Sequence, residues 1–355
     1  MMKIRLIRFL GLISASFVCL CCSFNDVKTG NRAVTISDIK WSLSQSKELD
    51  GAESLKTVLS YDLRKQYSLG YPASFVISND NNIYLVDNKN SAVFKVSADF
   101  QTFEQFIKSK NDSGFLEYPN QIKEFDNSIY INDNGGIRIV NKEGALQRTI
   151  QPQLGLNDFA LKTGEEFLIN PLYSINDKEL PLILKLDSQG KKSGTIGQMQ
   201  PTEYHGLENN VLLVTADSTL IVGYKQLPLI ELYDLTTNKL IKSIKVKEAI
   251  FDDLEHLKSN KALINPEPGK YRLPKYIAGL KLFKERIYVL LHLPYTEIIE
   301  FTLTGEIVQR YRSKESRIID YFGFDIRLLN STKQFFVGAF DLSHTPSMMV
   351  FEESK

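Results

Sequence analysis

Cysteine is nearly absent from this chain of 355 residues. Its three cysteines, Cys19, Cys21 and Cys22, all lie close to the N-terminus, and none follows Cys22. The rest of the chain therefore has no disulfide framework, no cysteine-based metal site and no cysteine nucleophile.

An excess of charge of one sign is also missing. The 43 lysines and arginines nearly balance the 42 aspartates and glutamates, which leaves a net charge of +1. Nucleic-acid binding relies on concentrated positive charge, so we expect no nucleic-acid partner. A glycine-rich phosphate loop, a serine nucleophile elbow and a His-Glu-x-x-His metal motif are absent too. The sequence thus offers no complete set of catalytic residues.

The first 22 residues, "MMKIRLIRFLGLISASFVCLCC", combine early positive charge with an apolar run that is short for a membrane span. This pattern predicts an export signal, with a buried N-terminal helix as the alternative. Because the run ends in cysteines, it resembles a bacterial lipoprotein signal, whose cysteine at the cleavage point is acylated. We predict lipidation at Cys22, with Cys21 as the alternative, and a polar tether over residues 23–40.

One phrase returns six times along the chain: an apolar strand, a polar break and a second apolar strand. The first strand of each pair is "NIYLVD" from Asn82, "SIYIND" from Ser128, "EFLINP" from Glu166, "TLIVGY" from Thr219, "RIYVLL" from Arg286 and "QFFVGA" from Gln334. Another apolar segment precedes each pair, and most copies carry a fourth. Alternating apolar residues and Asn, Asp or Gly turns indicate antiparallel strands.

Four-stranded units of roughly 40–50 residues are typical of β-propeller blades. We therefore predict an all-β fold for residues 41–355, a six-bladed β-propeller of four-stranded antiparallel blades. The sixth unit ends at its third strand. We expect the N-terminal segment "LKTVLSYDL", residues 55–63, to supply its outer strand and close the ring.

The first blade resembles the NHL repeat, in which a proline and an apolar strand precede Ile-Tyr-Val-x-Asp, polar residues and a further strand. The matching residues are Pro72, Ile83, Tyr84, Asp87, Asn90 and Val93. The second blade keeps Pro119, Ile129, Tyr130 and Asp133, and the later blades drift. Over residues 55–355 the chain is similar to exported six-bladed propellers of Bacteroidetes-type bacteria. That fold hosts binding proteins, scaffolds, lactonases and lyases, so the resemblance leaves the function open.

Tyrosines recur just before the innermost strands, on the face where propeller loops gather. They are Tyr71, Tyr118, Tyr204, Tyr276 and Tyr321. One interpretation is a ligand-binding aromatic ring that stacks on a sugar or grips a peptide. The alternative is that each tyrosine wedges between blades, with its hydroxyl bonded to a loop carbonyl. We expect the side chains of Asp87, Asp133 and Asn90 to bond turn backbone rather than a ligand.

We predict that the protein has no cofactor, and the alternative is a bound zinc or calcium ion. His205, His292 and His344 map to the same loop face, and three imidazoles with one open position hold catalytic zinc. A calcium site of the lactonase kind would instead use Asn120, Asn157 and Asp158 near the axis. The fourth histidine, His256, falls in a helical segment and is expected to be solvated.

An insert over residues 247–275, with "NPEPGKYRLP", interrupts the passage from the fourth to the fifth blade. It either covers the loop face or packs inertly against a blade edge. Taken together, the sequence favours a lipid-anchored binding or scaffold propeller in the bacterial cell envelope, on the periplasmic or exterior side of the outer membrane. Its partner would be a peptide, a glycan or an envelope protein. The alternatives are a metal-dependent hydrolase or lyase, or a subunit of an envelope complex.

Overall fold

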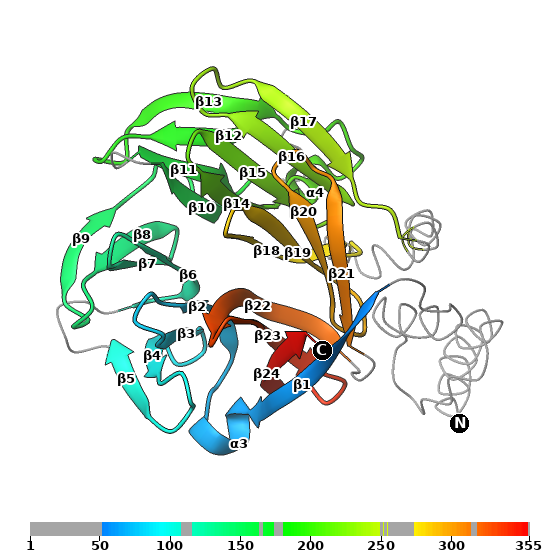
Figure 1. Ribbon diagram of the computed structural model, residues 1–355. Helices are drawn as coiled ribbons and strands as arrows, with labels where there is room; N and C mark the ends of the chain where they lie inside the picture. Colours follow the sequence, from blue (N-terminus) through cyan, green and yellow to red (C-terminus); the bar gives the residue numbers. More distant parts are fainter. Residues whose placement is uncertain are drawn as a thin grey trace, which may run out of the picture.

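The computed structural model describes residues 52–107, 116–162, 166–173, 180–248, 251, 254, 273–313 and 318–353 (Figure 1). The predicted signal with Cys22, the tether, His256 and nearly all of the insert lie outside these residues. Within the described ranges, no helix has the length and apolar character needed to cross a membrane.

Sixteen of the strands form four separate antiparallel sheets of four strands, each in chain order. The first two sheets consist of β2 (Pro72–Ile77), β3 (Ile83–Asp87), β4 (Ala92–Val96) and β5 (Phe103–Ile107), then β6 (Pro119–Phe125), β7 (Ser128–Asp133), β8 (Gly136–Val140) and β9 (Leu146–Ile150). The next two consist of β10 (Leu156–Lys162), β11 (Glu166–Pro171), β12 (Pro181–Leu186) and β13 (Lys192–Gln198), then β14 (Val211–Ala216), β15 (Thr219–Tyr224), β16 (Leu229–Asp234) and β17 (Leu240–Lys245).

The other eight strands form one continuous sheet in the order β18-β19-β20-β21-β1-β24-β23-β22. Their bounds are β1 (Glu53–Asp62), β18 (Ile277–Phe283), β19 (Arg286–Leu291), β20 (Glu297–Thr302), β21 (Ile307–Ser313), β22 (Ile318–Leu329), β23 (Thr332–Asp341) and β24 (Pro346–Glu353). The expected six separate four-stranded sheets are therefore not observed. The reason is that β1 uses both of its edges, pairing antiparallel with β24 and, at Glu53–Leu55, parallel with β21.

The sheets are arranged around a common centre (Figure 1). Each four-stranded sheet places its first strand innermost, and the eight-stranded sheet places both of its edge strands, β18 and β22, there. Innermost β2 contacts β6 and β22, β14 contacts β10 and β18, and β18 contacts β22. This arrangement is that of a β-propeller, and the predicted all-β propeller fold is confirmed.

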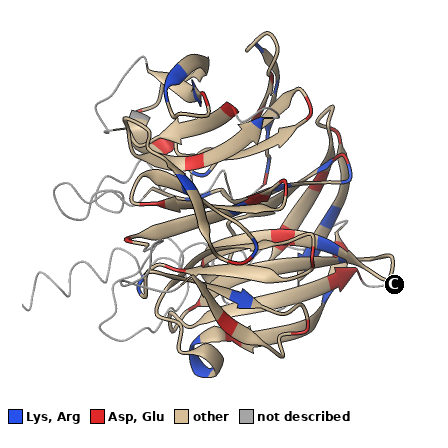
Figure 2. Cartoon of the chain, turned by 90° about the vertical axis from the view of Figure 1, so that its left-hand side faces the viewer, with Lys and Arg blue, Asp and Glu red and all other residues tan. Residues whose placement is uncertain are grey.

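Burial changes from the centre outward. Every residue of β3 is buried, whereas nearly every residue of β17 is exposed. The core lies between neighbouring sheets: Leu182 of β12 packs in one apolar cluster with Leu220 of β15. Each sheet thus depends on its neighbours to bury its faces. Lysines and arginines are interspersed with aspartates and glutamates over the strands (Figure 2).

Short helices also occur between strands of the described ranges, among them α3 (Leu63–Tyr67) and α4 (His205–Glu208). The Asp62 side chain caps α3 by accepting a hydrogen bond from the Lys65 amide at 3.0 Å. The helix predicted within the insert falls almost entirely outside the described residues.

Two buried aspartates fix the turns that carry rim tyrosines. The Asp87 carboxylate accepts hydrogen bonds from the Gly70 and Tyr71 amides at 2.7 and 2.9 Å. The Asp133 carboxylate does the same for the Tyr118 amide at 2.7 Å. The prediction that these side chains bond turn backbone is confirmed for both aspartates, whereas the Asn90 amide donates to the Asp87 carboxylate at 2.7 Å. These bonds explain why an aspartate ends the repeated phrase in its first two copies.

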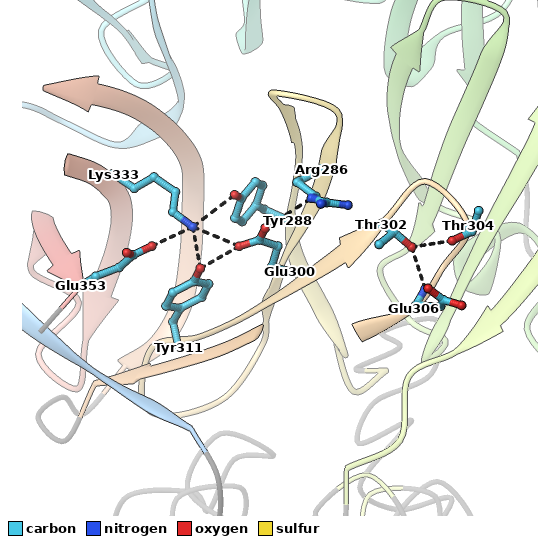
Figure 3. A network of polar contacts seen from close by, with 9 residues as sticks. All are labelled: Arg286, Tyr288, Glu300, Thr302, Thr304, Glu306, Tyr311, Lys333 and Glu353. Carbon is cyan, nitrogen blue, oxygen red and sulfur yellow. Dashed lines mark hydrogen bonds and ion pairs between the residues drawn. The ribbon is translucent and has the colours of Figure 1, made fainter. Parts of the chain in front are cut away.

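A polar network links the two halves of the eight-stranded sheet (Figure 3). The Lys333 amine of β23 donates to the Tyr311 hydroxyl at 2.6 Å and to the Glu300 carboxylate at 3.0 Å. It also forms an ion pair with Glu353 of β24 at 2.7 Å. Burial raises the pKa of the Tyr288 hydroxyl to about 12, so this neighbour of Lys333 stays protonated at neutral pH. The network therefore ties β19–β21 to β23 and β24.

Candidate functional site

A cavity of about 530 Å³ lies at the centre of the ring. Residues of all six innermost strands line it, together with Lys225, Lys275 and His292 from the loop face. Because every group of strands contributes one wall, this cavity is the central channel of the propeller. It falls in the size range of small-molecule sites.

Two ion pairs cross the channel wall from one innermost strand to the next. Lys123 of β6 contacts Asp158 of β10 at 2.8 Å, and Lys281 of β18 contacts Asp325 of β22 at 2.7 Å. The same aspartates accept backbone hydrogen bonds at 2.8 Å, Asp158 from Leu213 of β14 and Asp325 from Ile77 of β2. Each lysine–aspartate pair therefore connects three innermost strands, so both pairs stabilise the ring.

A third group lies toward the loop face. The Asp320 carboxylate of β22 faces the Lys275 amine at 2.7 Å and His292 Nε2 at 3.0 Å. Burial alone would raise the pKa of Asp320, but the hydrogen bond and charge of His292 and the charge of Lys275 lower it below its ordinary value. Asp320 is therefore a carboxylate at neutral pH.

Lys225 differs from the other lysines of the channel. It directly follows β15, is half-buried and lines the cavity. Among the described residues its amine has no hydrogen bond and no ion pair, whereas Lys123, Lys275 and Lys281 each contact a carboxylate. The remaining carboxylate of the cavity, Glu124, pairs with a lysine outside it. Lys225 is thus the lysine of the cavity that has no carboxylate partner in the described part of the chain.

The five predicted rim tyrosines separate into different environments. Tyr71 and Tyr118 are 51% and 58% exposed, and the Tyr71 ring stacks on Phe340 with centroids 5.1 Å apart. Tyr276 is fully buried and packs edge-on against Phe251. A continuous ring of five exposed tyrosines is therefore not formed, because the loop before β18 packs Tyr276 into the core.

Tyr204 and Tyr321 are half-buried. Tyr321 agrees with the alternative interpretation, in which the tyrosine hydroxyl bonds to loop carbonyls. Its hydroxyl donates to the carbonyls of Leu293 and Tyr295 at 2.9 and 3.0 Å. Tyr204 directly precedes α4, and its amide donates to the Glu208 carboxylate at 3.0 Å.

The three predicted zinc ligands have dissimilar surroundings. His292 is buried and bonded to Asp320, with its ring edge-on to Tyr321. His344 is exposed in the turn between β23 and β24, and its carbonyl accepts from Arg64 at 3.0 Å. For His205, only the backbone is described, as the first residue of α4. Within the described part of the chain, no three His, Cys, Asp or Glu side chains are grouped to hold a metal ion.

Asn120, Asn157 and Asp158, the predicted calcium ligands, all line the channel. The Asp158 carboxylate is already occupied by the Lys123 amine and the Leu213 amide. The Asn157 amide donates to the Pro171 carbonyl at 3.0 Å. An ammonium group on the carboxylate opposes a cation there, so these contacts do not fit a calcium site.

Sequence reasoning missed Lys225, Lys275 and Asp320. The repeat alignment does place them on the loop face: Lys225 follows a second strand, and Lys275 precedes an innermost one. A lysine at the end of a strand is usually solvated, however, so its position alone carried no signal.

No protein-family profile matches this chain, and no curated protein matches it. Among solved structures, it is similar to a luciferin-regenerating enzyme, with a TM-score of 0.53 and 11% identity over 83% of this chain and 95% of that one. It is also similar to catalytically inactive virginiamycin B lyase from Staphylococcus aureus with quinupristin, with a TM-score of 0.50 and 10% identity over 84% and 87% of the two chains. At these identities the likeness shows the propeller fold alone.

Proposed function

We propose that this protein is a binding propeller whose central channel takes a small anionic ligand, an acidic sugar, through the loop face. The unpartnered amine of Lys225 in the channel carries this proposal. Every carboxylate that lines the cavity is matched by another lysine, so an anionic ligand would supply the missing partner. A bound anion would favour the protonated form of Lys225, whose charge-assisted hydrogen bond with the ligand is stronger than a neutral one.

The exposed tyrosines support a sugar as the rest of the ligand. Tyr71 and Tyr118 directly precede the innermost strands β2 and β6, whose residues line the cavity. The two exposed rings therefore lie near the mouth of the channel. An aromatic face with a hydroxyl is suited to stacking against a sugar ring while bonding its hydroxyl groups.

Isothermal titration calorimetry with glucuronate and glucose tests this proposal. The two sugars differ by a carboxylate, so glucuronate should bind more tightly. Lys225→Met should remove that difference, whereas Lys245→Met, at an exposed lysine of β17, should retain it. Equal binding of both sugars, or glucuronate binding that survives Lys225→Met, would contradict the proposal.

We further infer that the ring has six blades. The eight-stranded sheet would comprise two of them, β18–β21 and β22–β24 completed by β1. Support comes from the six repeated phrases and from the pairing of β1 with β24. A chain that begins after Asp62 should then fail to fold cooperatively, and cooperative unfolding of that chain would argue against the closure.

We also propose export and lipid anchoring, with the channel facing the periplasm or the cell exterior. Support comes from the signal-like first 22 residues. Metabolic labelling with palmitate should tag the wild-type chain and fail with Cys22→Ser. Retained label in that variant, and loss with Cys21→Ser, would move the anchor to Cys21.

A further inference from the structure

We propose that Lys225 captures its ligand covalently, its amine forming an imine with a carbonyl group of a small carboxylate compound, a 2-oxo acid. This inference rests on the proposed function, since it uses the same channel and again requires a carboxylate on the ligand, although the ligand is here a 2-oxo acid and not a sugar. It adds a chemical step to binding. The observations that carry it are the placement of Lys225, its lack of a partner and the charges around it.

The backbone holds Lys225 firmly at the junction of two sheets. Its amide donates to the Asn210 carbonyl at 3.0 Å, and its own carbonyl accepts from the Tyr276 amide at 2.7 Å. Tyr276 is fully buried, so this junction is anchored in the core. A reactive side chain on such a fixed backbone presents its amine to the channel in a restricted region, which favours reaction with a bound ligand.

The groups that face Lys225 favour a neutral amine. Burial lowers the pKa of the Lys225 amine, and the charges of Lys275 and Lys123 lower it further, against the opposing effect of Asp158 and Asp320. His292, bonded to Asp320, and Tyr321 are further titratable groups that line the cavity. Desolvation and neighbouring cations are the conditions that make a lysine nucleophilic.

The reaction balances without an oxidant or a reductant. The lone pair of Lys225 Nζ forms a bond to the carbonyl carbon, and the carbonyl π electrons move to oxygen. Proton transfer from nitrogen to oxygen gives a carbinolamine, whose hydroxyl leaves as water when the C=N bond forms. Amine and carbonyl thereby become imine and water.

The charge of the product indicates why the ligand should carry a carboxylate. Apart from Lys225, the lysines and carboxylates that line the cavity are matched pairwise. A protonated imine adds one positive charge to this balanced set. A carboxylate on the same ligand neutralises it, as expected for a 2-oxo acid in a partly desolvated channel.

Reductive trapping with glyoxylate and sodium cyanoborohydride tests the inference on the intact protein at neutral pH. Reduction of the imine leaves a stable carboxymethyl group, which peptide mass spectrometry locates. Because burial lowers the pKa of Lys225, a larger share of its amine is neutral at neutral pH, so Lys225 should be modified severalfold faster than exposed Lys245. Uniform modification of the two lysines would overturn the inference.

Two variants separate this inference from the proposed function. Lys225→Arg keeps a positive charge but cannot form an imine, so it should lose the fast carboxymethylation while still binding glucuronate. Lys245→Arg should retain both properties. If the wild-type chain binds glucuronate but shows no preferential trapping at Lys225, the covalent step alone is refuted. If it shows neither glucuronate binding nor preferential trapping, the proposed function is refuted as well.

Discussion

Replacing Lys333 by methionine should destabilise the propeller strongly, because Lys333 is the centre of the network between the halves of the eight-stranded sheet (Figure 3). Methionine preserves most of the side-chain volume and removes the charge. The Glu300 carboxylate, whose side chain is 7% exposed, would lose its ion pair at 3.0 Å. It would keep the Tyr311 hydroxyl at 2.6 Å and an Arg286 contact at 3.8 Å.

The size of the effect follows from these contacts. Removing one partner of a buried pair costs about 3–5 kcal/mol. The remaining contacts of Glu300 and the 22% exposure of the Lys333 side chain reduce this to about 2–3 kcal/mol. The Glu353 pair is more exposed and adds less than about 1 kcal/mol.

Urea unfolding followed by circular dichroism measures this change. The matched control is Lys95→Met, since Lys95 contacts the exposed Glu104 at 3.9 Å and should cost less than about 0.5 kcal/mol. Adding Glu300→Gln to Lys333→Met should restore part of the loss, because no buried charge is then left unpaired. A cost for Lys333→Met no greater than for the control would refute the reasoning.

The pH dependence has a defined sign. The contact with Glu353 and the hydrogen bonds to Tyr311 and Glu300 outweigh burial and raise the pKa of Lys333 above the ordinary 10.5. The stabilisation is therefore complete below the unfolded-state pKa of 10.5 and is lost as the pH rises through the higher folded-state pKa. The difference between wild type and Lys333→Met should persist throughout the neutral range.

Three further predictions concern other parts of the chain. Lys225→Met should not lower stability at neutral pH. Because the folded-state pKa of Lys225 lies below the unfolded-state value of 10.5, protonation of this amine destabilises the folded state below pH 10.5. A loss above about 1 kcal/mol in urea unfolding would indicate a structural role instead. Asp87→Ala should cost about 2–3 kcal/mol in the same assay, since it orphans the Gly70 and Tyr71 amides, whereas Asp87→Asn should cost less. Protein lacking residues 1–22 should contain no stoichiometric zinc by mass spectrometry, and zinc that disappears in His205→Ala would revive the three-histidine enzyme.

Strand pattern and turn chemistry made the fold predictable. The repeated sequence pattern corresponds to buried second strands such as β3. Asp87 accepts hydrogen bonds from the turn backbone, as its position at the end of that strand predicts. These features are local, because alternation and an aspartate after a strand depend on neighbouring residues. The continuous eight-stranded sheet was not predictable, since the parallel contact of β1 with β21 joins opposite ends of the chain.

The candidate site depended on tertiary packing in the same way. Tyr276 and Tyr71 occupy equivalent places in the sequence, yet one is fully buried and the other half exposed. The Tyr276 ring packs against Phe251, which belongs to the insert and not to a repeated unit. The significance of Lys225 likewise depends on which neighbouring lysines find a carboxylate, and those pairings exist only once the ring is closed.

The most direct test of the central claim is a crystal structure of the protein soaked in bromide. Anomalous scattering locates bromide directly, whatever the natural ligand is. We predict a bromide ion in the channel within hydrogen-bond distance of Lys225 Nζ, and its loss in Lys225→Met crystals. An empty channel mouth, with bromide only at exposed surface lysines, would contradict the assignment of this cavity as an anion site.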